Sequence, residues 1–246
     1  MGLAVPGLMV WAKAAGRDGR PKPNLRQAAI PLVLAGLAFA VDVGTFHLAI
    51  FGTKVANAVF IGALTPILAV VGGAAFFAER PPGRVWVALG LALAGAWVMA
   101  GMTSPAAVGA GDAFALAAAI AYAAYVLFIK RLRLSLDAPT ATLWSAAVSA
   151  AALMAAAILR GEVLIPSTLL GWTIVALLGL VTHTLGQGLT SLAIGRTSVG
   201  LVALVMLAQP PFSALLAWGV LGEAMTGVQA IGGAIILAAV LLARPA

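Results

Sequence analysis

Cysteine and charge are what this sequence has least of. Its 246 residues include no cysteine, which excludes disulfide bonds, a thiolate nucleophile and any cysteine-ligated metal site. Only 9% of the residues are charged, while 63% are hydrophobic. A soluble protein of this length cannot hide so much apolar surface, because a large share of any folded surface faces solvent. We therefore expect a membrane protein.

Motifs of enzymes and of nucleotide binding are also lacking. HExxH, GxSxG, a P-loop and paired carboxylates at catalytic spacing do not occur, and Gly109-Ala110-Gly111 lacks the third glycine of a dinucleotide site. The net charge of +7 does not indicate nucleic-acid binding, because the basic residues are spread over short loops. We expect no enzyme activity, no cofactor, no metal ion and no nucleic-acid partner.

The hydrophobic residues form runs of about twenty, the length that crosses a bilayer as a helix. Strands of a β-barrel would instead appear as alternating segments of about ten residues. We predict an all-α polytopic membrane protein with about eight transmembrane helices and a short N-terminal apolar segment, residues 1–12. This segment resembles the end of a truncated helix, the alternative being a re-entrant or interfacial start. The predicted spans are 28–51, 55–77, 84–103, 110–129, 139–159, 168–194, 198–221 and 225–243.

Lysine and arginine are distributed unequally between the two sides that these spans define. One side carries only Lys54 and Arg160. The other carries Lys13, Arg17, Arg20, Lys22, Arg26, Arg80, Arg84, Lys130, Arg131, Arg133, Arg196 and Arg244. Positive loops stay in the cytoplasm, so the second side and the C-terminus are predicted to be cytoplasmic, in the cell membrane.

The chain repeats itself after 144 residues. This shift aligns Leu48-Ala49-Ile50 with Leu192-Ala193-Ile194, Thr53 with Thr197, Val55 with Val199, Pro66 with Pro210 and Glu79 with Glu223. Five crossings separate the matched spans, and because five is odd the two halves have opposite orientations in the membrane. We predict two inverted five-helix repeats, an incomplete one in residues 1–103 and a second in 109–244. Inverted repeats are typical of secondary transporters, whose substrate site lies near the bilayer midplane.

The residues that carry this repeat resemble the EamA family of the drug/metabolite transporter superfamily. The similar stretches are "VDVGTFHLAIFGTKVANAVFIGALTPILAVVGGAAFFAER" in the first half, and "GDAFALAAAIAYAAYVLFIKRLR" and "THTLGQGLTSLAIGRTSVGLVALVMLAQPPFSALLAWGVLGE" in the second. The resemblance covers residues 28–243 and implies ten spans in two fused five-helix units. By that plan the chain lacks the first helix and most of the second. We expect a fragment with a late start, the alternative being a truncated protein with an incompletely closed pathway.

Polar side chains inside the spans are the candidates for substrate contact. Asp42 lies near the middle of a span, where a carboxylate costs at least about 2.5 kcal/mol unless a partner or a polar cavity receives it. His183, Gln187 and Ser191 are four residues apart, so they share one helix face. The predicted substrate-binding residues are Asp42, His47, Asn57, Thr65, Tyr122, His183, Gln187 and Gln209. The alternative for each is a packing role, for example an amide hydrogen bond that joins two helices.

Pro66 and Pro210 are predicted hinges, because proline removes a helical hydrogen bond and bends the helix. A static kink that improves packing is the alternative. Asp42 and His183 would bind the coupling proton if transport is proton-coupled, since both groups can change charge in a buried site. Glu79 and Glu223 lie at span ends, where we favour a structural role.

Together these features predict a secondary transporter, an exporter of small polar metabolites such as amino acids, that works by alternating access. Its partners would be the small-molecule substrate and the lipid bilayer. A flippase for lipid-linked substrates is an alternative within transport, and an intramembrane enzyme or a non-transporting scaffold are alternatives from other classes.

Overall fold

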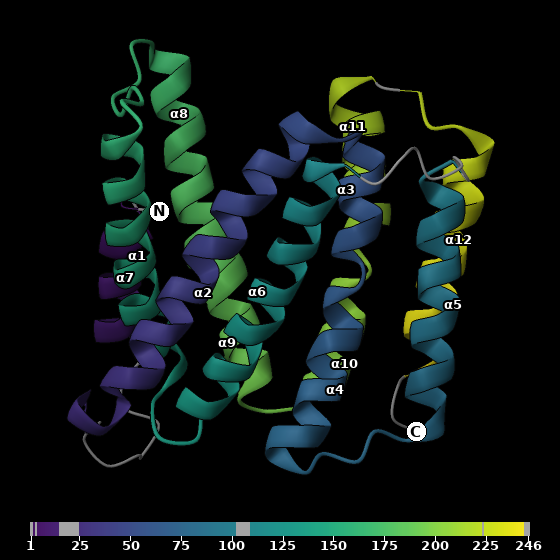
Figure 1. Cartoon of the computed structure of the whole chain (residues 1–246), viewed down its shortest axis with the longest axis horizontal. Helices are drawn as coiled ribbons and strands as arrows, with labels where there is room; N and C mark the ends of the chain where they lie inside the picture. Colours follow the sequence, from purple (N-terminus) through teal and green to yellow (C-terminus); the bar gives the residue numbers. More distant parts are fainter. Residues whose placement is uncertain (1, 3, 15–24, 102–108, 223, 244–246) are drawn as a thin grey trace. The chain divides into compact units, whose positions relative to one another are not determined.

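The computed structural model describes residues 2, 4–14, 25–101, 109–222 and 224–243, and their regular structure is entirely helical (Figure 1). The helices are α1 (Ala4–Ala14), α2 (Leu25–Gly52), α3 (Val55–Gly62), α4 (Thr65–Phe77), α5 (Gly83–Met99), α6 (Ala110–Leu132), α7 (Ala138–Leu159), α8 (Leu169–Leu177), the π-helix η1 (Leu178–Gln187), α9 (Gly188–Ile194), α10 (Val199–Met206), α11 (Gln209–Leu221) and α12 (Gly227–Leu242). Six helical stretches of the described chain are long and apolar enough to cross a bilayer. The predicted all-α polytopic membrane fold is confirmed.

Two of the eight predicted spans, 84–103 and 225–243, form shorter apolar helices, α5 and α12. Helix α5 ends at Met99 because Gly101 adopts a left-handed backbone with φ of 86°, which stops a helix. Helix α12 begins after Thr226, whose hydroxyl accepts from the Gln229 N–H while the Gln229 side chain accepts from the Thr226 N–H. This capping box fixes the start of α12 two residues later than predicted.

Two other predicted spans are broken helices. The span 55–77 divides into α3 and α4, and the span 198–221 divides into α10 and α11. Pro66 and Pro210 are each the second residue of the helix that follows the break. Proline fits there because the first residues of a helix have no internal partner for their N–H groups. Each proline thus follows a short turn inside one apolar helical span, Asn57–Phe77 or Val199–Val220, and its role as a hinge stays a prediction.

The helix bounds repeat with the shift found in the sequence. The starts of α3 and α10, of α4 and α11, and of α5 and α12 are each separated by 144 residues, at positions 55 and 199, 65 and 209, and 83 and 227. The ends of α4 and α11 show the same relation, because Ala78 and Gly222 both have left-handed backbones, with φ of 51° and 70°. The repeat is thus present in the backbone as well as in the sequence.

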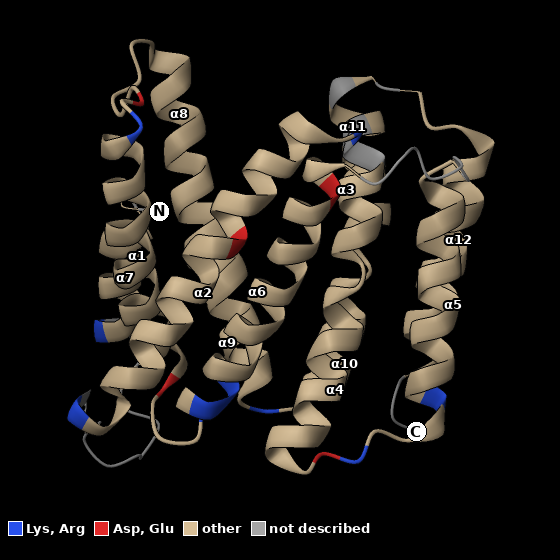
Figure 2. Ribbon diagram, viewed as in Figure 1, with Lys and Arg blue, Asp and Glu red and all other residues tan. Residues whose placement is uncertain are grey.

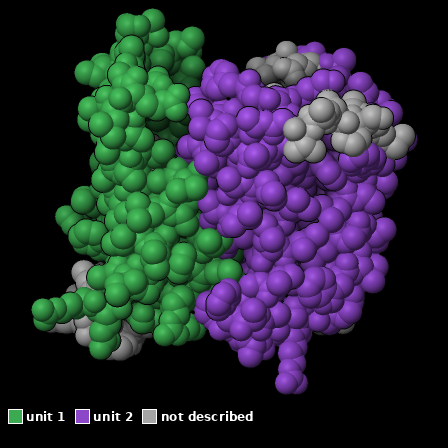
Figure 3. Space-filling view, in the orientation of Figure 1, with its two compact units in different colours: residues 1–41, 124–197 green, residues 42–123, 198–246 purple. Residues whose placement is uncertain are grey.

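The described chain forms two compact units, each drawn from both halves of the sequence (Figure 3). Unit 1 contains residues 1–41 and 124–197, and unit 2 contains residues 42–123 and 198–246. Helices α2 and α6 run from one unit into the other. The units thus divide the chain differently from the predicted repeats at 1–103 and 109–244, and that division stays a prediction.

In unit 2, the most extensive helix pair is α5 with α12, which cross through glycines. A Cβ added to Gly95 would lie 2.8 Å from the carbonyl oxygen of Gly232, so the two backbones touch. Gly95 also contacts Ile236, while Gly232 contacts Met99, which shows that the helices are antiparallel. The repeat equivalent of Ile236 is Ala92, one turn from Gly95. Helix α5 therefore packs against its own equivalent, as expected at a local pseudo-two-fold axis.

In unit 1, the N-terminal apolar segment is the helix α1, which packs against α7 and η1. Ala4 and Leu8 are fully buried and form a cluster with Ala146 of α7. Gly7 lies against the Thr184 side chain of η1. The segment predicted as the end of a truncated helix is thus a packed helix of the bundle.

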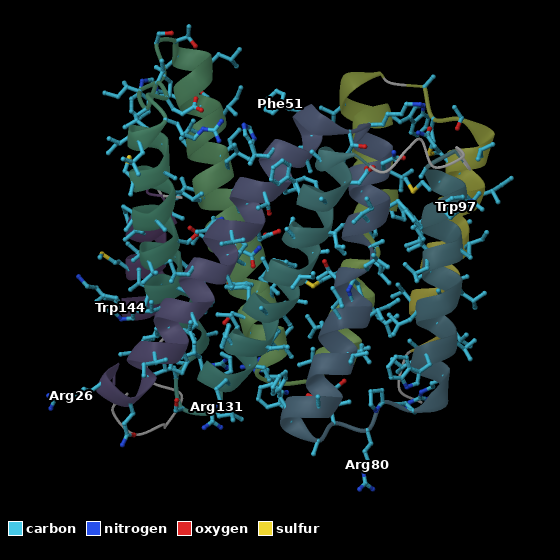
Figure 4. The ribbon with its side chains drawn as sticks, in the orientation of Figure 1. Arg26, Phe51, Arg80, Trp97, Arg131 and Trp144 are labelled. Atoms are coloured by element: carbon cyan, nitrogen blue, oxygen red, sulfur yellow. The ribbon has the colours of Figure 1, made fainter. Side chains whose placement is uncertain are left out.

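Charged residues collect at the ends of the helices in both units (Figure 2). In unit 1, Arg26 and Arg131 lie at the end opposite the α7–α8 connection, with side chains directed away from the helices (Figure 4). That connection carries Arg160, whose Nε lies 3.6 Å from a carboxylate oxygen of Glu162. Within unit 1 this distribution agrees with the two sides predicted from the sequence.

The glycine crossing predicts how α5 tolerates substitution. Gly95→Ala should lower the free energy of unfolding by about 1–3 kcal/mol, because the new methyl group meets backbone atoms of α12. Gly90→Ala on the same helix is the matched control, since nothing lies within 4 Å of its added Cβ and alanine favours the helix. Unfolding in detergent measures both, and an equal effect would contradict the crossing.

Candidate substrate site

Three aromatic rings meet inside unit 1, from three helices. The ring centroid of Phe39 on α2 lies 4.7 Å from that of Tyr125 on α6 and 5.0 Å from the imidazole of His183 on η1. All three side chains are buried, with 9% of His183 exposed and less of the others. Tilted rings at these separations attract each other beyond the effect of burial. The predicted substrate residue His183 thus packs against Phe39, which in turn packs against Tyr125, and the sequence analysis selected neither of these two aromatic residues.

Phe39 and His183 are repeat equivalents, because their positions differ by 144. Helix α2 and the stretch α8–η1–α9 run in opposite directions, so the two equivalents face each other where antiparallel helices cross (Figure 1). A residue contacts its own equivalent only near the pseudo-two-fold axis that relates two repeats. In an inverted-repeat membrane protein that axis lies in the membrane plane, and substrate sites of such proteins lie at the repeat interface near the midplane.

His183 is held in a π-helix, which the sequence did not predict. The Thr184 hydroxyl donates to the Gly179 carbonyl oxygen, five residues back, at 3.1 Å, and it also lies 3.3 Å from the Ala4 carbonyl oxygen of α1. Turns of π-helix are rare and frequently occur at functional sites. The predicted inward face of this stretch is nevertheless the buried one, because His183 and Ser191 are buried and Gln187 is half-buried.

Two buried hydroxyl groups near this stretch have no hydrogen-bond partner among the described residues. They are Ser191 Oγ on α9 and Thr142 Oγ1 on α7, two helices that pack together in unit 1. Both side chains are at most 1% exposed. Buried polar groups are normally paired, and these two are available to a solute or to water.

Asp42 lies three residues beyond Phe39 on α2, about 60° around the helix from it. Its side chain is half-buried, and no hydrogen bond or ion pair joins its carboxylate to another residue that the structure describes. An unpaired carboxylate within an apolar helix requires a polar environment. This property keeps Asp42 a candidate for contact with substrate or a proton.

His47 is exposed on α2, and its ring packs edge-on against Phe51 at 5.1 Å. Phe51 itself lies at the end of α2 (Figure 4). Tyr122 is half-buried on α6, and Gln209 is the exposed first residue of α11. Their roles in binding substrate stay predictions.

Thr65 and Asn57, both in unit 2, make contacts within the protein. The Thr65 hydroxyl donates to the Ala119 carbonyl oxygen of α6 at 3.3 Å. The Asn57 amide donates to the Thr53 hydroxyl at 3.4 Å, and that hydroxyl donates to an Asp112 carboxylate oxygen at 2.7 Å. The second Asp112 oxygen accepts from the Gly109 N–H. Asp112 therefore joins the start of α6 to the α2–α3 connection, a role the sequence analysis missed.

Lys130 and Arg133, predicted only as orienting charges, stabilise the end of unit 1. The Lys130 ammonium donates to the carbonyl oxygens of Thr197 and Ile194, at 2.7 and 3.3 Å. A cation beside the last carbonyl groups of a helix satisfies them and opposes the helix dipole. Arg133 is 3% exposed and donates to the Leu136 carbonyl oxygen at 2.6 Å.

Comparisons with known proteins agree with this architecture. The sequence model of the EamA-like transporter family matches residues 1–101 and 109–244. Among solved structures 28 chains match, and one crystal structure of a protein superposes with a TM-score of 0.69 at 21% sequence identity. That superposition covers 98% of this chain and 96% of the other, so the two share their fold over almost their whole lengths. No curated protein matches in sequence.

The ring cluster predicts an unequal response of two phenylalanines on α2. Phe39→Ala removes a buried ring and both of its aromatic contacts, so the free energy of unfolding should fall by about 3 kcal/mol. Phe51→Ala is the control, because that side chain is 79% exposed, and should change it by less than about 1 kcal/mol. Denaturant unfolding in detergent measures both. Similar losses in the two variants would show that Phe39 is not part of a packed cluster.

Proposed function

Because the chain belongs to the EamA-like transporter family, we propose that it exports small polar metabolites such as amino acids by alternating access. Membership makes it a multi-pass membrane transporter of the drug/metabolite type, in a family of transporters and not enzymes. Its substrate is therefore a small molecule, and its surroundings are a lipid bilayer. We assign it to the cytoplasmic membrane, with the C-terminus in the cytoplasm.

The observation that carries the proposal is the contact of Phe39 with its repeat equivalent His183. In alternating access, two inverted repeats exchange conformations, so a site on their pseudo-two-fold axis is reached from either side in turn. A polar side chain at this position is costly unless it is used, and the equivalent position in the first repeat is an apolar phenylalanine. The difference between the two equivalents supports a binding role for His183.

The polar groups on this side of unit 1 suit an uncharged or zwitterionic polar solute. Ser191 and Thr142 offer buried hydroxyl groups, Gln187 offers an amide, and His183 offers an imidazole. A bound solute that pairs with the two unpartnered hydroxyls would replace the water they would otherwise need. The Phe39 ring, which packs against His183, would contact the apolar part of the solute.

The energy source follows from the lack of an ATP-binding motif in the sequence. Transport is then driven by the substrate gradient or by an ion gradient. Under proton coupling, Asp42 and His183 are the residues that would carry the proton, because each is a titratable side chain inside a span. Pro66 and Pro210 would serve as hinges, since each follows a break between two short helices.

Flux in proteoliposomes tests the proposal. Purified protein should move at least one amino acid of a labelled mixture, and His183→Gln should lower the initial rate about tenfold or more, because it removes the imidazole from the ring cluster. Glu162→Gln is the control, since its exposed carboxylate pairs only with the neighbouring Arg160 among the described residues, and it should transport normally.

A pH gradient across the same vesicles tests the coupling. If protons are coupled, the gradient should accelerate uptake by the unaltered protein, and Asp42→Asn should abolish this acceleration. Unchanged coupling in both Asp42→Asn and His183→Gln would remove these residues from the proton role. Equal solute flux into vesicles with and without the protein would contradict the proposed transport function.

A further inference from the structure

In unit 2, a carboxylate that follows the helix pair α3–α4 contacts the start of the helix pair α10–α11. Glu79 follows α4, and its two oxygens accept from the Val199 N–H, the first of α10, at 3.0 and 3.3 Å. The side chain is half-buried, and the contact links residues 120 positions apart. We propose that Glu79 is a latch that holds α4 against α10 and so keeps this end of unit 2 closed in one state of the transport cycle.

The residue before Glu79, Ala78, has a left-handed backbone. Ala78 has a φ of 51°, the only positive φ at a non-glycine residue of the described chain. This left-handed turn costs alanine roughly 1 kcal/mol, and it lets the Glu79 N–H reach the Gly73 carbonyl oxygen at 3.3 Å. The equivalent turn in the second repeat uses Gly222, which adopts the same conformation without strain. The left-handed turn thus ends α4 directly before Glu79, the residue that contacts α10.

The start of α10 is suited to receive a carboxylate. The N–H groups of the first turn have no partner within the helix, and the helix dipole places partial positive charge there. The Ser198 hydroxyl accepts a hydrogen bond from the Leu201 N–H, and the Glu79 carboxylate accepts one from the Val199 N–H. At the start of α3, the repeat equivalent of α10, Lys54 occupies the capping position and provides no side-chain cap.

The helix pair α4–α10 is also packed more closely than its repeat equivalent, the pair α11–α3. Helices α4 and α10 pack closely, with Val70 beside Gly200 and Gly73 beside Val199. Among the described residues, α11 and α3, their repeat equivalents, do not pack over a comparable length. In an inverted repeat that alternates, equivalent contacts close in turn, so this structure corresponds to the state closed at the Glu79 end.

This inference rests on the proposed transport function, but the latch can be measured without any substrate. The sequence has no cysteine, so two introduced cysteines are the only thiols that can form a disulfide bond within the chain. A Cβ at Gly200 would lie 3.5 Å from a Val70 methyl carbon, so Val70→Cys with Gly200→Cys places two thiols within disulfide reach. The rate of oxidative crosslinking in membranes then measures how often α4 and α10 are together.

Added to this cysteine pair, Glu79→Ala should lower the crosslinking rate about tenfold, because a hydrogen bond to a charged group is lost. Glu79→Gln should give a smaller loss, since its amide oxygen still accepts from the Val199 N–H without a charge. Glu162→Ala, which removes an exposed carboxylate from the α7–α8 connection, should leave the rate unchanged. An unchanged rate in Glu79→Ala would overturn the latch.

Circular dichroism and gel filtration check that each variant is folded. If Glu79→Ala does not fold, Glu79→Gln carries the same test, and a rate equal to that of the unaltered pair overturns the proposal. Reduced crosslinking in a protein that moves no solute would support the latch and contradict transport, so the two failures are distinguishable.

Discussion

The contact between Phe39 and His183 sets where the candidate site lies, because it brings a residue against its own repeat equivalent. Packing of this kind requires two helices of opposite direction that share one sequence plan. The same relation recurs in unit 2, where α5 and α12 cross at Gly95 and Gly232. In both units the helices near the local pseudo-axis approach through small or flat side chains, which allow close contact without a hydrophobic driving force between spans.

Polar groups at the helix ends are satisfied by a few long-range contacts, as a membrane protein requires. Lys130 donates to the last carbonyl group of α9 and to that of Thr197, Asp112 fixes the start of α6, and Glu79 accepts from the first N–H of α10. Each of these charged groups lies at the end of a span, where water reduces the cost of charge. Asp42 and His183 lie within spans instead, and that difference separates candidates for function from residues that hold the fold.

The sequence predicted the helical class and six spans of bilayer-crossing length, because long apolar runs are a strong signal. Its 144-residue shift recurs in the starts of three helix pairs, while the division into two five-helix repeats stays a prediction. It also predicted the buried face that carries His183 and Ser191. It placed Pro66 and Pro210 inside two spans, and both residues lie within apolar helical stretches of bilayer-crossing length. The short turn before each proline was not predicted, because a hydrophobicity pattern does not encode local backbone geometry.

Other parts of the site depend on tertiary contacts. The π-helix η1 forms where α1 and the His183 ring cluster pack, and no local pattern distinguishes it from an α-helix. Phe39 resembles the other apolar residues of its span. The 144-residue shift aligns it with His183, however, and this alignment could have identified it as a candidate site residue. Tyr125, Asp112 and Glu79 owe their roles to partners more than fifty residues away.

Exchange of Phe39 and His183 tests whether the substrate site lies on the pseudo-two-fold axis. Phe39→His and His183→Phe are made singly and together, and the initial rate of solute flux is measured for all three variants in proteoliposomes. We expect each single variant to transport poorly and the exchanged pair to recover much of the rate, because the ring contact is restored with its members interchanged. An exchanged pair no more active than the single variants would contradict a site on the axis between the repeats.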